Sequence, residues 1–362
     1  MLKTFDEVFD DYTKYGTKIK TEQYETIGTN IIIDQGQSDI AGYTDQSEGL
    51  FTDVPVIVFG DHTRIIKYIN RPFFLGADGT KILKSKIPDA NYKYLYYALK
   101  NAKIPNTGYN RHFKWLKQIS ISYPEHEKQS MIVEILDKLE DSIDNYNTIL
   151  GLLDKLVKAR FIEMFGDLKS NEKDWNLKTF EEMSVLITDG EHSTPKRTKE
   201  GIYLLSARNV LNHSLQLKDV DYINRDEYLR IAKRVVPKKG DILISCSGTI
   251  GRCCSVPDSL QLQMVRSVAL IRFKEVINPI FAEYMITSDY LQEQINSSKT
   301  MSSQANLFQG KIRKLKGFLP PTELQNQFAD FVEQVDKSRE AVKKSLEKTQ
   351  QLYDSLMQEY FG

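Results

Sequence analysis

The side chains that could do chemistry in this chain stand in loops punctuated by glycine, and their types suit recognition better than catalysis. Arg, Lys, Asn and Gln carry the hydrogen-bond groups that match base edges, whereas Ser, Thr, Tyr and further cations hold phosphates. The candidates in the first half of the sequence are Gln35, Gln37, Tyr43, His62, Thr63, Arg64, Tyr109, Asn110, Arg111 and His112. Those in the second half are His192, Thr194, Lys196, Arg197, Arg208, Asn209, Ser247, Thr249, Arg252, Ser303, Gln304 and Asn306.

Motifs that would indicate catalysis are incomplete. The segment Asn278-Pro279-Ile280-Phe281 lacks the second proline of an adenine methyltransferase turn. Neither Pro88-Asp89 nor Pro257-Asp258 is followed by the acidic residue and lysine of a common Mg²⁺-dependent nuclease. The histidines have no metal-ligand spacing. We therefore expect no catalytic residue and no metal site in this chain.

Several candidates also have a purely structural interpretation. Arg208-Asn209 could close a strand and cap a turn instead of meeting a ligand. Gly248-Thr249-Ile250-Gly251 lacks the lysine of a phosphate-binding loop and is better read as a tight framework turn. The tyrosines of Tyr92–Tyr97 favour a packed helix over a base-stacking platform. The basic cluster Lys311, Arg313, Lys314 and Lys316 is equally compatible with phosphate contact and with a solvated face.

The elements that position these loops come from an internal repeat. Leu2–Glu7 returns as Leu177–Glu182, an offset of 175 (177 − 2). Leu116–Pro124 matches Ile312–Pro320, an offset of 196 (312 − 116). Because the offset grows along the chain, the second copy carries longer loops on the same frame. Recurring framework residues with unlike loops indicate one fold with two different specificities.

Each copy begins with a globular part, 1–123 and 167–319. Short β-rich runs such as Val54–Phe59 and Asp241–Ser245 alternate with turn signals and with helical stretches such as Tyr92–Lys100. The pattern predicts mixed α+β domains.

Each copy ends in a long helix, predicted over 124–166 and 320–362. Apolar residues alternate in spacing between four and three, which defines a heptad seam. The first seam is Ile132, Leu136, Leu139, Ile143, Tyr146, Leu150, Leu153 and Val157. The second is Phe328, Val332, Val335, Val342, Leu346 and Tyr353, with polar residues at the seam positions Arg339 and Thr349.

Neither seam is expected to remain exposed to water. Each helix of roughly 38 residues would be about 57 Å long. We predict that the two helices pair antiparallel within the chain about a pseudo-two-fold axis, holding the globular domains at opposite ends. Two separate helical hairpins, or a homodimer through one helix, are the alternatives.

Composition limits the class of protein. The 362 residues have room for two globular domains and extra helices, and the formal net charge of zero argues against strong non-specific polyanion binding. Three cysteines, Cys246, Cys253 and Cys254, are expected to be reduced thiols. Because neither a signal peptide nor a membrane span is evident, we expect a cytoplasmic protein.

Four segments of the second domain carry a resemblance to a known family. They are Asp189–Pro195, Leu205–Val210, Gly240–Ser245 and Gly248–Gly251, in that order. Their arrangement resembles the recognition-domain frame in the specificity subunit of type I DNA restriction–modification systems. Pro124…Gln129 and Pro320…Gln325 look like the family's entry into each helix.

The first domain departs from that frame. It has Asp34-Gln35-Gly36, Ile40–Tyr43 and Phe59–Thr63 at the corresponding places, and it looks like another subtype of the same domain.

The resemblance, which covers nearly the whole chain, implies the function. Such a subunit neither cuts nor methylates DNA and binds no cofactor itself. It reads a bipartite site on double-stranded DNA, one half per target-recognition domain, and its helices set the spacing. It would dock two adenine-N6 methyltransferase subunits, which bring S-adenosylmethionine, and two restriction subunits, which use ATP and Mg²⁺. A coiled-coil scaffold that bridges other proteins without DNA is the competing interpretation.

Overall fold

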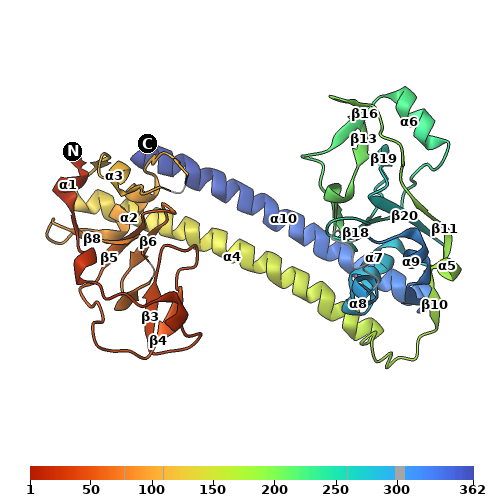
Figure 1. Ribbon diagram of the computed structural model, residues 1–362, viewed down its shortest axis with the longest axis horizontal. Coiled ribbons are helices and arrows are strands. Elements are labelled where there is room, and N and C mark those ends of the chain that lie inside the picture. The colour runs from red at the N-terminus through yellow and green to blue at the C-terminus, as the bar shows by residue number, and fades with distance from the viewer. Residues whose placement is uncertain (77, 109, 259, 298–305) are drawn as a thin grey trace. The chain divides into compact units, whose positions relative to one another are not determined.

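The chain forms two compact units, each of which combines a globular domain with a segment of both long helices. The computed structural model describes residues 1–76, 78–108, 110–258, 260–297 and 306–362 (Figure 1). Unit 1 comprises Met1–Ile149 and Val342–Gly362, and unit 2 comprises Leu150–Ala341. The long helices are α4 (His126–Phe165) and α10 (Thr322–Phe361).

The globular part of unit 1, between β1 (Leu2–Thr4) and β9 (Ser120–Ser122), is called domain 1 below. Its larger sheet is antiparallel, in the order β2 (Phe9–Asp11), β8 (Thr80–Ser85), β5 (Val56–Gly60) and β6 (Ile66–Ile69). Its smaller sheet has the order β4 (Gly42–Thr44), β3 (Asn30–Ile33) and β7 (Phe73–Leu75), with β3 and β7 parallel. Helix α2 (Tyr92–Lys100) packs against β5 and β6.

The globular part of unit 2, between β10 (Leu177–Thr179) and β21 (Lys316–Phe318), is called domain 2. Its larger sheet has the order β11 (Ser184–Asp189), β20 (Val268–Phe273), β17 (Ile242–Ser245) and β18 (Cys253–Ser255). Its smaller sheet has the order β12 (Arg197–Thr198), β16 (Asp221–Ile223), β13 (Ile202–Leu205) and β19 (Leu262–Met264), with β13 and β19 parallel. Its described α-helices are α5 (Phe180–Met183), α6 (Arg225–Ala232), α7 (Pro279–Thr287), α8 (Asp289–Ser297) and α9 (Gln309–Lys314).

Strand register and helix caps identify equivalent positions in the two domains. Val56–Phe59 of β5 matches Ile242–Ser245 of β17 at an offset of 186 (242 − 56), so Val58 corresponds to Ile244. Val58 lies opposite Lys67 and Ile244 lies opposite Cys253, so Lys67 corresponds to Cys253. The N-caps of α2 and α7 are Asn91 and Asn278, whose side chains accept backbone N–H groups of their helices. The repeated sequence thus folds into a repeated mixed α+β domain, as predicted.

The domains differ in the connection that follows β3 and β13. Eight residues (34–41) join β3 to β4, whereas fifteen (206–220) join β13 to β16. The additional seven residues allow a hairpin of β14 (Val210–Leu211) and β15 (Ser214–Leu215), which packs on β18. The longer loops expected in the second copy include this insertion.

In unit 1 the beginning of α4 packs against the end of α10. Ile132 and Leu136 share a buried cluster with Tyr353 and Met357, and side chains of α2 complete it. The Tyr353 hydroxyl donates a 2.8 Å hydrogen bond to Glu140, linking the two long helices.

Helix α2 is fastened to α4 by a polar network in the same region. The Tyr97 hydroxyl lies 2.7 Å from Asp137 and 2.9 Å from Glu140, and Lys100 lies 2.6 Å from Glu140. Burial and these carboxylates together raise the pKa of Tyr97 well above its usual range. The network therefore holds domain 1 on its helical segments through neutral and charged hydrogen bonds as well as apolar packing.

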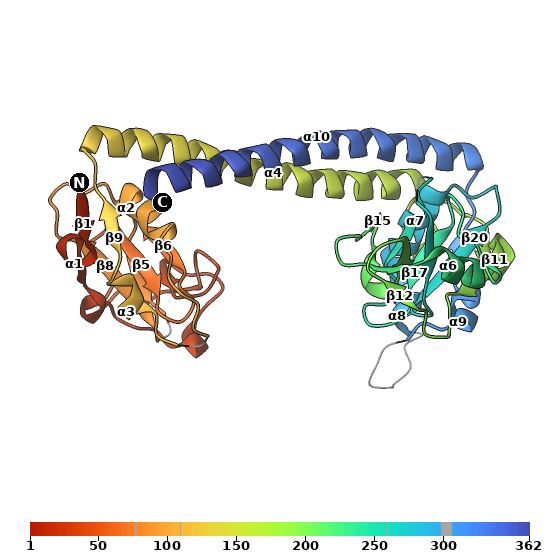
Figure 2. The same cartoon turned by 90° about the horizontal axis from the view of Figure 1, so that it is seen from above.

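In unit 2 the end of α4 packs against the beginning of α10 (Figure 2). Val157 and Phe161 are buried with Phe328, Val332 and Val335. Because the start of one helix lies against the end of the other in each unit, the paired segments are antiparallel. The prediction of two long antiparallel helices is confirmed.

The ends of the long helices follow local signals. The helices begin two residues after the predicted starts at 124 and 320, and each ends one residue earlier than predicted. Gly166 adopts φ of +79° and its N–H bonds the Ile162 carbonyl, 2.7 Å away, which is the left-handed turn that commonly closes a helix.

Every seam residue named from the sequence is buried or half-buried. The fully buried ones lie toward the globular domains, where α2 or α7 adds a further layer. The central ones, from Leu139 to Leu153 and from Val342 to Thr349, are only half-covered. Two helices alone cover only one stripe of each other, so the middle of the seam is less protected.

Three observations concern special chemistry. The three cysteines are free and buried, and burial raises the pKa of Cys246 and of Cys254 to about 12, so these thiols stay protonated. No group of metal-ligating side chains is found among the described residues. Within the same residues, no helix has the length and apolar character needed to span a bilayer.

Candidate nucleic-acid interface

In domain 1 the loops after β3 and β5 meet, and Gln35 ties them together. Its Oε1 accepts a hydrogen bond from the His62 backbone N–H at 3.1 Å, and its Nε2 donates to the Asp78 carbonyl at 2.8 Å. The Thr63 hydroxyl donates to the Gln35 carbonyl at 2.7 Å. Because both ends of its amide are engaged within the protein, Gln35 positions the loops and His62 rather than presenting a free amide.

His112 attaches a third segment to this cluster. It is fully buried, its backbone N–H donates to the Asp61 carbonyl at 2.8 Å, and its Nδ1 lies 3.0 Å from the same oxygen. The expectation that His112 touches a ligand is therefore corrected, because no surface of its ring is exposed. Its role is to anchor the exposed Arg111 and Asn110 beside the loop after β5.

The remaining candidate residues of domain 1 differ in their exposure and in their contacts. Gln37 and Arg111 are exposed. The hydrogen bond from Lys18 and, to a smaller extent, the charge of Arg111 lower the pKa of Asp78. Arg64 is half-buried and its guanidinium donates to the Ile104 carbonyl at 3.3 Å. Tyr43, on β4, packs against the core of domain 1. Tyr109 lies outside the described residues.

In domain 2 the turn after β13 carries Arg208 on its outer side and Asn209 inside. Asn209 is fully buried; its Oδ1 accepts the Ser206 N–H, and its Nδ2 donates to the carbonyls of Gln216 and Asp219 at 3.0 and 2.8 Å. The expectation of ligand contact at Asn209 is corrected, because its amide is saturated by backbone groups. Its function is to fix the turn that displays Arg208.

Two arginines of domain 2 share one carboxylate. Arg197 Nε lies 2.9 Å from Asp221, Arg208 lies 3.4 Å from the other oxygen of that carboxylate, and Arg208 is also 3.6 Å from Asp219. Both arginines remain about half exposed. The carboxylates restrict the conformations of both arginine side chains. Less side-chain conformational entropy would therefore be lost when a ligand binds.

The loop from Asp189 to Lys196 is held by charged residues of the neighbouring α6 and of the turn that follows it. His192 lies 2.8 Å from Asp189, which also pairs with Arg234. Arg230 donates to the Ser193 hydroxyl at 3.2 Å and lies 3.0 Å from Glu227. Arg230 and Arg234 were not among the residues predicted from the sequence; Arg230 lies on α6, and Arg234 lies in the turn that follows the helix.

Two carboxyl groups of this loop region have a shifted pKa. The hydrogen bond from the Ser193 hydroxyl lowers the pKa of Glu191, and the hydrogen bond from Arg230 lowers that of Glu227. Both residues are therefore charged at neutral pH and hold Thr194 and Lys196, which are exposed, in a defined loop.

The glycine-bounded turn after β17 supports its neighbours as well as exposing polar groups. Gly248 and Gly251 adopt φ of +70° and +85°, a conformation that L side chains rarely adopt. Thr249 is exposed, and Ser247 forms a β-bridge with Asn306. Arg252 is half-buried and donates to the Ala207 carbonyl at 2.8 Å, so it supports the turn that carries Arg208. Ser303 and Gln304 lie outside the described residues.

The basic cluster at α9 is partly structural. Arg313 donates to the Ile187 carbonyl at 2.9 Å, which joins α9 to β11. Lys311, Lys314 and Lys316 are exposed or half-buried at the surface.

The exposed candidates therefore gather at the ends of strands in each domain, on turns that buried amides and guanidiniums hold in place. Cationic and amide groups displayed this way can contact phosphates and base edges. Different side chains occupy equivalent turns in the two domains: Gln35, Gly36 and Gln37 follow β3 where Ala207, Arg208 and Asn209 follow β13.

Comparison with known proteins agrees with this arrangement. The sequence matches the family described as "Type I restriction modification DNA specificity domain" over residues 2–154 and 172–351. It is 22% identical to the Escherichia coli type I restriction enzyme EcoR124I/EcoR124II specificity subunit over 361 residues, covering 93% of this chain and 86% of that protein. It is also 22% identical to the MjaVIII specificity subunit of Methanocaldococcus jannaschii, covering 78% and 74% of the two chains.

A solved structure shows the same fold. The crystal structure of the type I restriction–modification S subunit from M. genitalium superposes with a TM-score of 0.65 at 17% sequence identity, covering 100% of this chain and 96% of that one.

Proposed function

Because this chain belongs to the type I restriction–modification DNA specificity family, whose members recognise DNA sequence and leave catalysis to other subunits, we propose that each of its two domains reads one half of a bipartite site. The observation that carries the proposal is the repeated topology with unlike loops. Domain 1 displays Gln37 and Arg111, and domain 2 displays Arg197 and Arg208 on the same topology. Unlike side chains on equivalent turns select unlike base sequences.

The long helices fit the role of spacer. Each has 40 residues, so each is about 60 Å long. Half-sites about one helical turn of DNA apart would fit within that length. On this proposal the length of α4 and α10 sets the number of unread base pairs between the half-sites.

The partners follow from the family. We propose that the helices and domains dock adenine-N6 methyltransferase subunits, which bring S-adenosylmethionine, and restriction subunits, which use ATP and Mg²⁺. None of these cofactors is proposed to bind this chain. The EcoR124I relative is named as part of such a restriction enzyme.

The test is selection of DNA from a random pool by the chain assembled with its methyltransferase subunit, followed by affinity measurements at several salt concentrations. A reader should prefer its site over unrelated duplexes by about 10³-fold or more. The selected sequences should contain two conserved blocks separated by a spacer of fixed length. Equal affinity for all duplexes would favour the scaffold interpretation, and a single conserved block would refute one half-site per domain.

A further inference from the structure

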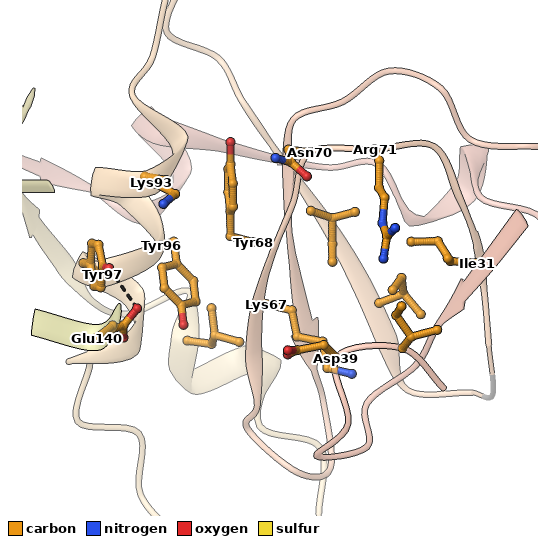
Figure 3. A pocket seen from close by; sticks show the side chains of 14 residues that line it. Ile31, Asp39, Lys67, Tyr68, Asn70, Arg71, Lys93, Tyr96, Tyr97 and Glu140 are labelled. Atoms are coloured by element: carbon orange, nitrogen blue, oxygen red, sulfur yellow. Dashed lines mark hydrogen bonds between the residues drawn. The ribbon is translucent and has the colours of Figure 1, made fainter. Parts of the chain in front are cut away.

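Domain 1 has an open pocket of about 480 Å³ at the place where domain 2 carries its hairpin. Its lining comes from β3, β6, residues 70–71 after β6, α2, the loop 39–40 and Glu140 of α4, all within unit 1 (Figure 3). Strand register and helix caps identify the equivalents of the lining residues Lys67, Tyr96 and Tyr97 in domain 2.

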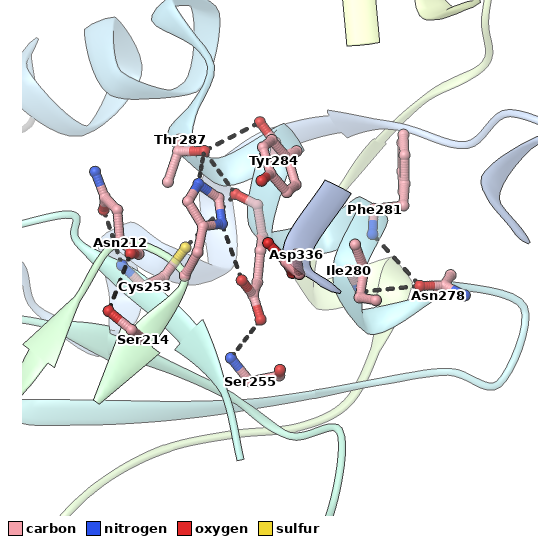
Figure 4. Close-up of polar contacts among 12 residues, drawn as sticks. Asn212, Ser214, Cys253, Ser255, Asn278, Ile280, Phe281, Tyr284, Thr287 and Asp336 are labelled. Atoms are coloured by element: carbon pink, nitrogen blue, oxygen red, sulfur yellow. Dashed lines mark hydrogen bonds and ion pairs between the residues drawn. The ribbon is translucent and has the colours of Figure 1, made fainter. Parts of the chain in front are cut away.

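The equivalents in domain 2 hold the hairpin β14–β15. Lys67 corresponds to Cys253, whose carbonyl accepts the His213 N–H at 2.9 Å. Tyr96 and Tyr97 stand five and six residues after Asn91, as Glu283 and Tyr284 stand after Asn278. His213 lies 2.9 Å from Glu283, and its ring stacks on Tyr284 at a centroid distance of 4.0 Å (Figure 4). Domain 2 therefore fills with its own peptide the site that domain 1 leaves open.

In domain 1 no described strand pairs beyond β6 at this edge of the sheet. Strand β6 is the last strand of its sheet, as β18 is of the equivalent sheet. In domain 2 the hairpin supplies hydrogen bonds to both backbone groups of Cys253, since the Asn212 side chain accepts the Cys253 N–H at 3.4 Å. No strand or hairpin pairs with the outer edge of β6 among the described residues. Such an edge is a template for an added strand.

The side chains around the pocket indicate what the occupant carries. Lys93 and Glu140 are engaged, by Asp137 at 2.5 Å and by Lys100 at 2.6 Å. Lys67 is buried, with its amine donating to the Ser38 carbonyl at 2.6 Å. Arg71 is exposed at the rim and has no hydrogen-bond or ion-pair partner within the described part of the chain. A guanidinium in this position suits a carboxylate, and the Tyr68 and Tyr96 rings offer apolar walls.

We propose that this pocket is the docking site for an extended segment of the methyltransferase subunit, which pairs with the edge of β6 and places an acidic side chain against Arg71. The inference rests on the proposed function, because that function supplies the partner. The same site in domain 2 needs no partner segment, since its own hairpin occupies it. Docking at this site would therefore distinguish the two domains.

The first experiment uses the complete complex with target DNA. A photoreactive benzoylphenylalanine replaces Tyr68 in the pocket, and in a control chain it replaces the exposed Tyr15. The expected result is a cross-link from position 68 to the methyltransferase polypeptide, with none from position 15. A cross-link from position 68 to DNA, or to neither molecule, would overturn the proposal.

The second experiment measures assembly directly. Arg71→Glu should weaken binding of the methyltransferase subunit by about tenfold or more, because a like charge would then face the acidic side chain. Lys20→Glu makes the same charge change at another exposed position of domain 1 and should leave binding unchanged. Equal affinity of Arg71→Glu and wild type would overturn the proposal.

The experiments can refute the proposed DNA-reading function and the docking inference independently of each other. If the assembled wild-type complex shows no preference for any DNA sequence, the proposed reading function is wrong. If it discriminates normally while Arg71→Glu assembles like the wild type, only the docking inference is wrong. Circular dichroism of the isolated variants checks that the fold is retained.

Discussion

Arg339 of α10 lies 2.8 Å from the Asp154 carboxylate of α4, at a seam position where the heptad pattern favours an apolar side chain. The Arg339 side chain is only 19% exposed, whereas Asp154 is 67% exposed, so the guanidinium lies along the seam and reaches outward to its partner. Asp336 is a second partner on the same helix. A polar group at a single seam position commonly fixes register at a cost in stability.

Replacing Arg339 by an apolar residue should therefore increase the stability of the protein. Arg339→Leu is expected to raise the free energy of unfolding by about 1 kcal/mol, since an apolar side chain suits the seam and exposed ion pairs contribute little. Urea denaturation measures the change. Asp154→Ala, which removes the partner but keeps the arginine, should lower stability by less than about 1 kcal/mol. A large loss of stability in Arg339→Leu would contradict the interpretation.

Arg208 should determine part of one half-site. Arg208→Ala is expected to reduce discrimination at one or two base pairs by about 1–3 kcal/mol while the other half-site stays unchanged. Selection from a random DNA pool provides the measurement. Lys218→Ala, at another exposed cation of domain 2, serves as control. Equal weakening for all sequences would instead assign Arg208 to phosphate contact.

Arg111 should determine part of the other DNA half-site. Arg111→Ala is expected to relax choice in the half-site that Arg208→Ala leaves intact, because the two residues belong to different domains. The same selection, run on both variants in parallel, makes the comparison. If both substitutions relax the same block, the assignment of one half-site per domain fails.

Asn209 should act through stability. Asn209→Ala would remove the two hydrogen bonds that its buried amide donates to the carbonyls of Gln216 and Asp219, at a cost of about 1–3 kcal/mol in the free energy of unfolding. The exposed Gln37→Ala provides the control, for which urea denaturation should show no change. An unaltered unfolding midpoint for Asn209→Ala would show that its amide is not needed to hold the turn.

Acid should loosen the loop from Asp189 to Lys196. The folded pKa of Glu227 is lowered, chiefly by its hydrogen bond with Arg230, so its contribution to stability is present above the unfolded value of about 4.3 and is lost as the pH falls through the folded pKa. Thermal unfolding of wild type and Glu227→Gln should therefore differ at pH 7 and converge as the pH falls through the lowered pKa of Glu227 in the folded protein. A difference that persists unchanged at acidic pH would exclude this carboxylate as the cause.

The sequence alone determined the parts of this protein that depend on local periodicity. The alternation of four and three residues from Ile132 to Val157 predicts a long helix with one apolar stripe, because the period of the α-helix is fixed by its backbone. Repeated segments such as Leu2–Glu7 and Leu177–Glu182 require repeated structure. The resemblance of the Asp189–Gly251 motifs to a recognition-domain frame identified the family.

Only the tertiary structure decided which polar side chains remain available. Gln35, His112 and Asn209 have the types that a ligand contact needs, yet each is engaged with groups far along the chain or across a turn. Sequence pattern reports how a residue relates to its neighbours in the chain, whereas hydrogen bonds and burial depend on segments that meet only after folding. For the same reason the pocket beside β6 is visible only when domain 1 is compared with the hairpin-filled site of domain 2.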